Sequence, residues 1–179
     1  MNRKVEVVQH NPNWRSLFDI ESAHITVALG KNVMAIHHIG STAITAIYAK
    51  PIIDILVEVR LIDKVDASNP EMQLLGYECM GEFGILNRRF FLKNNPTGIR
   101  THHVHIFSSN FAQIDRHLAF RDYMNTHPES AQKYSELKQE LAKNYPNDIE
   151  GYMDGKNEFI REIDRKAANW KMSEGNSVY

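Results

Sequence analysis

Apolar residues recur at two different spacings along this chain, and the spacing changes near residue 108. Before that point, short apolar runs are bounded by Gly, Pro and Asn, which is the pattern of strands. After it, apolar residues return every third or fourth position, which is the pattern of amphipathic helices. The patterns predict strands over residues 1–9, 33–39, 51–59, 77–80, 87–93 and 101–107, helices over 12–29 and within 61–75, and about three helices beyond 108.

This order of elements predicts an α+β fold: a mixed β-sheet with flanking helices and a C-terminal helical segment packed on it. Glycines and the turn at 94–98 separate the three strands between 77 and 107, so we expect an antiparallel meander there. No stretch rich in Pro, Gly and Ser divides the chain. We therefore expect one domain over 1–179, with the sheet and N-terminal helices in 1–108 and the C-terminal helices in 109–172.

Charge and cysteine content narrow the classes of function. The 21 basic and 22 acidic side chains give a net charge of -1, so the chain lacks the positive field that non-specific duplex binding requires. The single cysteine, Cys79, excludes an intramolecular disulfide and any zinc site built from several cysteines. The start has no apolar signal-peptide region, and no run of about eighteen apolar residues occurs, so the sequence predicts a cytoplasmic protein without membrane contact.

Asp54 stands in the most apolar of the predicted strands. Ile53 and Ile55 share one face of this strand, whereas Asp54 and Glu58 share the other. A carboxylate in such a strand needs a metal ion, a cation or several hydrogen-bond donors, because burial of an unpaired charge is costly. The alternative interpretation is that Asp54 only accepts hydrogen bonds from the loop at 40–42.

A glycine and two hydroxyl residues, Gly40, Ser41 and Thr42, follow the strand predicted over 33–39. Because glycine has no Cβ, such a turn leaves backbone N–H groups accessible to a phosphate. The same residues also fit an ordinary N-cap of a short helix. The turn is a candidate phosphate-binding loop, although Gly-Ser alone is not a specific signal.

Histidines cluster in the last predicted strand. His103 and His105 alternate with apolar residues, so both imidazoles lie on one face, about 7 Å apart, a span that one ion bridges. His102 points to the opposite face. With a carboxylate from a neighbouring strand, the pair predicts a divalent metal site; without one, both are hydrogen-bonded sheet residues.

Basic residues gather around the predicted meander and beside the carboxylate strand. Arg88 and Arg89 are adjacent and point to opposite faces, so at most one of them enters a given pocket. Lys50 comes directly before the strand that carries Asp54. Guanidinium and ammonium groups suit phosphate oxygens, and the alternative is that they are solvated charges protecting a sheet edge.

Seven motifs follow one another over essentially the whole chain. They are His38–Ala43 (HIGSTA), Lys50–Ile55 (KPIIDI), Gly81-Glu82, Arg88–Phe91 (RRFF), Arg100–His105 (RTHHVH), Phe120–Tyr123 (FRDY) and His127–Glu129 (HPE). In this order and register they resemble the GrpB family, which is regarded as a predicted member of the nucleotidyltransferase superfamily, largely without an established substrate.

The resemblance implies a glycine-serine turn that grips a triphosphate and carboxylates that hold divalent ions. Gly40, Ser41 and Asp54 match this signature. Leu56 stands where the second carboxylate is expected, and the strand that should carry the third acid carries His103 and His105 instead. Imidazole ligands favour manganese, zinc or another first-row ion over magnesium.

Residues and resemblance together predict a metal-dependent nucleotidyltransferase-like enzyme that takes a nucleoside triphosphate and an unknown acceptor. A non-catalytic nucleotide- or ligand-binding module of the same fold, and a metal-dependent phosphoester hydrolase, remain alternatives. We expect the divalent ion to be Mg, Mn or Zn and the partner to be a small-molecule substrate. Nothing in the sequence points strongly to nucleic acid. The formation of a homo-oligomer is a further possibility that the sequence does not decide. The expected residues are Asp54 and Ser41 for catalysis, Gly40, Ser41, Thr42, Lys50, Arg88 and Arg89 for the nucleotide, and Asp54, Glu58, His103 and His105 for the metal.

Overall fold

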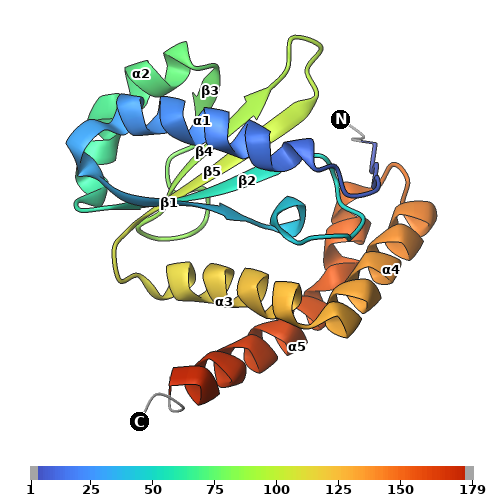
Figure 1. Cartoon of the computed structure of the whole chain (residues 1–179). Coiled ribbons are helices and arrows are strands. Elements are labelled where there is room, and N and C mark those ends of the chain that lie inside the picture. The colour runs from blue at the N-terminus through green and yellow to red at the C-terminus, as the bar shows by residue number, and fades with distance from the viewer. Residues whose placement is uncertain (1–3, 176–179) are drawn as a thin grey trace. The chain divides into compact units, whose positions relative to one another are not determined.

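A computed structural model describes residues 4–175, which form two compact units (Figure 1). The sheet unit comprises Pro12–Gly40 and Ile52–Ile114. The helical unit comprises the segment before Pro12, Ser41–Pro51 and the chain from Asp115 onward. Two short segments from the first half of the chain thus group with the C-terminal helices.

The sheet unit contains one mixed five-stranded sheet in the order β1-β2-β5-β4-β3. β2 and β5 pair in parallel, and all other neighbouring pairs are antiparallel. The predicted α+β class and the predicted antiparallel meander of the last three strands are both confirmed. The strands are β1 (Val33–Ile39), β2 (Ile53–Val59), β3 (Tyr77–Cys79), β4 (Arg89–Asn94) and β5 (Arg100–Ser108).

The apolar composition of β2 explains its central position between β1 and β5. Ile53, Ile55 and Val57 are buried on one face, as the alternation predicts. Between β2 and β3 the chain forms the 3-10 segment η3 (Ile62–Ser68) and the short helix α2 (Asn69–Leu74). Two further single turns, η1 (Gly30–Asn32) and η2 (Ser41–Ala43), flank β1.

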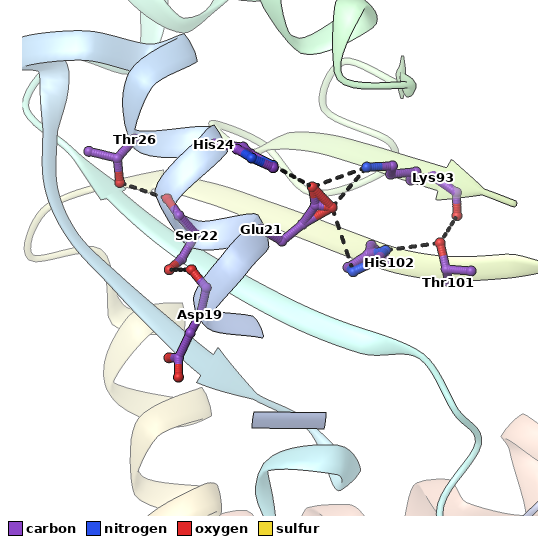
Figure 2. A network of polar contacts seen from close by, with 8 residues as sticks. All are labelled: Asp19, Glu21, Ser22, His24, Thr26, Lys93, Thr101 and His102. Atoms are coloured by element: carbon purple, nitrogen blue, oxygen red, sulfur yellow. Dashed lines mark hydrogen bonds and ion pairs between the residues drawn. The ribbon is translucent and has the colours of Figure 1, made fainter. Parts of the chain in front are cut away.

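Helix α1 (Asn13–Leu29) packs on one face of the sheet and is fixed there by a buried polar network (Figure 2). Glu21 of α1 is only 5% exposed, and its carboxylate accepts hydrogen bonds of 3.0 and 2.9 Å from Lys93 Nζ of β4. His102 Nε2 of β5 lies 3.6 Å from the same carboxylate. His102 thus faces α1, opposite to His103, as the strand alternation predicts.

The helical unit packs three helices around two apolar clusters. Tyr134 and Ile163 belong to the larger cluster together with Ile44. Val5, Leu141 and Tyr152 form the smaller one. The helices are α3 (Ala112–Thr126), α4 (Pro128–Asn144) and α5 (Ile149–Gly175). Among residues 4–175, none of the helices combines the length and apolar character needed to cross a bilayer.

The strand predicted over residues 1–9 is wrong for the residues that the structure describes. Residues 1–3 lie outside them, and of the rest only Val8 forms a β-bridge, with Ala49. Val5 N instead donates to the carbonyl of Pro146 at 2.9 Å. Apolar and polar residues do alternate in this segment. Its backbone groups, however, bond to two different parts of the chain, at Ala49 and at Pro146, and not to one continuous strand.

Candidate functional site

The parallel pairing of β2 and β5 brings one carboxylate against two imidazoles. In this register Asp54 is opposite His103, and Leu56 is opposite His105. His103 Nδ1 lies 3.1 Å from Asp54 Oδ1, and His105 Nε2 lies 3.8 Å from the same oxygen. The two imidazole centroids are 6.5 Å apart. Asp54, His103 and His105 therefore form one carboxylate–imidazole group on the sheet face opposite α1.

The glycine that ends β1 lies directly against this group. Ile39 is paired with Asp54, so the next residue, Gly40, turns past the Asp54 side chain. Gly40 has a φ of 71°, and a Cβ built on it would lie 2.6 Å from Asp54 Oδ2. Any side chain at this position would therefore collide with the carboxylate, and only glycine fits both the backbone angle and the space.

Two arginines determine which imidazole nitrogens carry protons. Arg100 Nη1 lies 3.2 Å from His103 Nε2, and Arg88 Nη1 lies 3.4 Å from His105 Nδ1. A guanidinium only donates, so these two imidazole nitrogens accept. The remaining protons then sit on His103 Nδ1 and His105 Nε2, which both face Asp54. Each arginine thus donates toward one imidazole, and the N–H group of each imidazole points toward the Asp54 carboxylate.

These contacts and the burial of the group shift two pKa values. Burial alone would raise the pKa of Asp54, but the hydrogen-bonding contacts with His103 and His105 lower it well below its ordinary value. Burial lowers the pKa of His105, and its contact with Asp54 only partly opposes this. Near neutral pH the group therefore holds an ionised carboxylate beside a neutral His105.

We expect the Asp54 carboxylate to make stability depend on pH in acid. Its pKa is lower in the folded than in the unfolded state, so its contribution is present above the unfolded value and lost as pH falls below it. Between about pH 5 and pH 3 the parent should lose about 1 kcal/mol of unfolding free energy more than Asp54→Asn. Urea unfolding at both pH values measures this difference.

His105 shifts stability in the same direction but over a higher pH range. Because its folded pKa is also lowered, its contribution falls as pH drops below about 6.5, before Asp54 is protonated. The comparison therefore starts at about pH 5. Asp19→Asn, at an exposed position on α1, serves as the matched control. Equal acid losses in the parent and in Asp54→Asn would contradict the assignment.

Not all predicted site residues join this group. Glu58 lies four residues further along β2, about 13 Å away at the usual rise, and its Oε1 is 2.7 Å from His37 Nε2. Arg89 forms a two-pronged ion pair with Asp66 at 2.7 and 3.0 Å. The structure therefore pairs Glu58 and Arg89 with other partners, while Arg88 turns toward the imidazoles.

Three predicted residues, Ser41, Thr42 and Lys50, belong to the helical unit. Ser41 and Thr42 form the single turn η2, and the Ser41 carbonyl accepts a hydrogen bond from the backbone of Ile44. Lys50 Nζ lies 5.2 Å from the ring centre of Tyr152 on α5. Their role at a nucleotide stays a prediction.

The donor set does not fit a resident metal ion held by the protein alone. Within residues 4–175, no three or more His, Cys, Asp or Glu side chains are arranged to hold a metal. Leu56, at the position where the resemblance to nucleotidyltransferases implies a second carboxylate, is 0% exposed. A single carboxylate instead suits an ion such as Mg²⁺ that keeps waters and takes most ligands from a bound phosphate.

Two members of the site, Arg100 and Phe90, stand in the sequence only within the RTHHVH and RRFF motifs, and the sequence predicts no place in the site for either. The Phe90 ring lies 5.5 Å from His103 and 5.1 Å from His105, with the Arg88 guanidinium 4.8 Å from its centre. The turn between β4 and β5 offered a signal, because hairpin pairing places Phe90 opposite His105.

Comparison with known proteins identifies relatives over nearly the whole chain. The family model for GrpB protein matches residues 4–166. The UPF0157 protein YqkA of Bacillus subtilis is 43% identical over 175 residues, which cover 98% of this chain. The matched region is 50% of YqkA, so the chain spans about half the length of that curated relative.

Solved structures agree on the fold. The crystal structure of conserved protein GrpB from Enterococcus faecalis superposes with a TM-score of 0.89 at 41% identity, covering 93% of this chain and 99% of that one. Cid1 in complex with its short product ApU gives a TM-score of 0.52 at 12% identity, covering 76% of this chain and 43% of Cid1, a likeness of fold alone. The fold is thus nucleotidyltransferase-like, and the chain belongs to the GrpB family.

Proposed function

We propose that the protein binds a nucleoside triphosphate at the carboxylate–imidazole group and transfers its nucleotidyl moiety to an acceptor. In this reaction an acceptor hydroxyl oxygen forms a bond to the α-phosphorus. The bond from that phosphorus to the bridging oxygen breaks, pyrophosphate leaves with the electron pair, and the hydroxyl proton passes to solvent. The proposal extends to this chain the nucleotide chemistry of Cid1, a poly(U) polymerase that has been solved with MgGTP bound.

One observation carries the proposal: an ionised carboxylate lies directly against a glycine turn on a nucleotidyltransferase-like sheet. Because Gly40 has no side chain, the backbone of the turn lies close to the carboxylate: a Cβ built on Gly40 would be 2.6 Å from Asp54 Oδ2. The Asp54 side chain keeps 26% of its surface exposed, which leaves it accessible to a ligand. A glycine turn of this kind suits close approach of phosphate oxygens.

We further propose that a divalent ion accompanies the triphosphate and is held by Asp54. Such an ion would neutralise phosphate charge, which is the chemistry it supplies when bound. His103 and His105 then act on the ion only through Asp54, because their protonated nitrogens face the carboxylate. This arrangement favours Mg²⁺, which protein sites bind through one or two carboxylates and substrate phosphates.

Asp54→Asn tests the proposal, because the amide keeps the shape of the side chain and removes its charge. For each nucleoside triphosphate that the parent binds with Mg²⁺, we expect the Kd of the variant to be at least about 30-fold higher. The reason is that the loss of one charged partner costs about 2 kcal/mol or more of binding free energy. Isothermal titration with ATP, GTP, CTP and UTP measures this. Asp19→Asn should bind as the parent does, and equal affinity in Asp54→Asn would overturn the proposal.

A second candidate function, nucleotide binding without transfer, is favoured by Leu56. A fully buried leucine in the place of the second carboxylate removes a ligand on which two-ion catalysis depends. Incubation with α-labelled nucleoside triphosphates separates the two candidates. Release of pyrophosphate with labelled product supports transfer, saturable binding without release supports the binding module, and release of free phosphate without labelled acceptor supports the hydrolase alternative.

A further inference from the structure

Three lysines gather around two tyrosines inside the helical unit. Lys138 Nζ of α4 lies 4.4 Å from the ring centre of Tyr134. Lys156 Nζ of α5 lies 4.7 Å from the ring centre of Tyr152, and Lys50 Nζ lies 5.2 Å from the same ring. We call Lys50, Lys138 and Lys156 the lysine cluster. All of its residues belong to one unit, so the cluster does not depend on the carboxylate–imidazole group.

The lysine cluster is buried to an unusual degree. Lys138 is 1% exposed and Lys156 is 7% exposed, whereas lysine is almost never fully buried unless it is paired. Only Lys50 of the three is partly exposed. Of the three side chains, Lys50 is thus the most accessible to solvent, and Lys138 is the least accessible.

Within residues 4–175, the three N–H groups of Lys138 have no acceptor. Its Nζ is buried and forms no hydrogen bond with any residue in the described part of the chain. Burial, and then the like charges of Lys156 and Lys50, lower its pKa to about 7. The Tyr134 ring offsets part of this cost, because a cation over an aromatic face gains about 0.5 to 2 kcal/mol.

The arrangement is unfavourable for the protein alone and favourable for a bound anion. Neighbouring positive charges repel one another, and a buried ammonium group without an acceptor loses its hydration. A ligand with several negative charges would remove both costs at once. An apolar or neutral ligand would remove neither, so the chemistry of the cluster selects for charge.

We propose that the lysine cluster is a binding site for the terminal phosphates of an oligophosphate group. Ammonium groups donate to phosphate oxygens from several directions, and a diphosphate or triphosphate end offers acceptors to all three lysines. A polymer backbone would need a continuous basic surface, whereas the acidic and basic residues of this chain balance to a net charge of -1. The proposed ligand is therefore a compact chain end, which comes from a free oligophosphate or from a nucleotide.

Tripolyphosphate tests the lysine cluster directly. At about a hundredfold excess over Kd we expect it to raise the melting temperature of the parent by about 5 °C or more at constant ionic strength. Lys138→Met should melt higher than the parent without ligand, because an unpaired charge is removed. The same variant should bind tripolyphosphate about tenfold more weakly or worse.

Lys133→Met is the matched control, because it makes the same substitution at an exposed position of α4. It should respond to tripolyphosphate as the parent does. Lys156→Met provides a second variant of the cluster and should weaken binding as well. If both cluster variants respond like the parent, or if sodium sulfate at equal ionic strength gives the same shift, the proposal is overturned.

ATP distinguishes the two sources of the oligophosphate. A response to ATP that survives Asp54→Asn and disappears in Lys138→Met assigns the site to the tail of a nucleotide. A response to tripolyphosphate, but not to ATP, assigns it to a free oligophosphate. Either result supports the lysine cluster independently of the proposed nucleotidyl transfer.

Discussion

Gly40→Ala is expected to lower the free energy of unfolding by about 3 kcal/mol and to abolish nucleotide binding at Asp54. The φ of 71° strains any residue other than glycine by about 1 kcal/mol or more. The new Cβ would also lie 2.6 Å from Asp54 Oδ2 and 3.1 Å from the Cβ and Cγ of the same side chain. Asp54 must therefore move, which breaks its hydrogen bond with His103.

Gly30→Ala separates the two contributions. Gly30 has a similar φ of 60°, but a Cβ built there meets nothing within 4 Å. At its φ of 60° and ψ of -142° this control should lose about 1 to 2 kcal/mol, the cost of backbone strain alone, and should bind nucleotide as the parent does. Chemical denaturation gives the stabilities and titration gives the affinities. Equal losses of stability in Gly30→Ala and Gly40→Ala would show that the contact with Asp54 carries no energy.

Lys93→Met is expected to lower the free energy of unfolding by about 3 kcal/mol. The substitution leaves the Glu21 carboxylate, which is 5% exposed, without the ammonium that donates to both of its oxygens. His102 and His24 each lie 3.6 Å from the carboxylate and compensate only in part. This places the loss at the lower end of the range for a broken buried ion pair. Urea denaturation measures it.

A double-mutant cycle with Glu21→Gln isolates the ion pair. The combined variant should lose less than the sum of the single losses by about 1.5 kcal/mol or more, because removing both charges leaves neither unpaired. Arg15→Met, which breaks the exposed Arg15–Asp19 pair on the same helix, should cost less than about 0.5 kcal/mol. Additive single losses would contradict a coupled buried pair.

Local periodicity by itself determined much of the molecule. The apolar run over 33–39 is β1 with the same bounds, and the strand around Asp54 is the buried β2. The alternation of β5 also determined that His103 and His105 share a face and that His102 points to the opposite one. These features could be predicted because side-chain direction in a strand depends only on the parity of the position.

Long-range pairing decided the carboxylate–imidazole group. Asp54 and His103 are 49 residues apart, and only the parallel register of β2 and β5 sets them opposite each other. The partners of Glu58 and Arg89, which are His37 and Asp66, follow from a neighbouring strand and a distant segment in the same way. A sequence pattern carries side-chain direction but no register between distant strands, so these partners could not be derived from it.

The lysine cluster shows the same limit in the helical unit. Lys138 stands four residues after Tyr134, so helical spacing alone places both on the apolar face of α4. Lys156 and Lys50 come from α5 and from the segment before β2, and no local spacing relates them to Lys138. The sequence by itself therefore determined which faces are buried, whereas only the tertiary structure decided which charges meet, because burial is a local pattern and charge pairing is not.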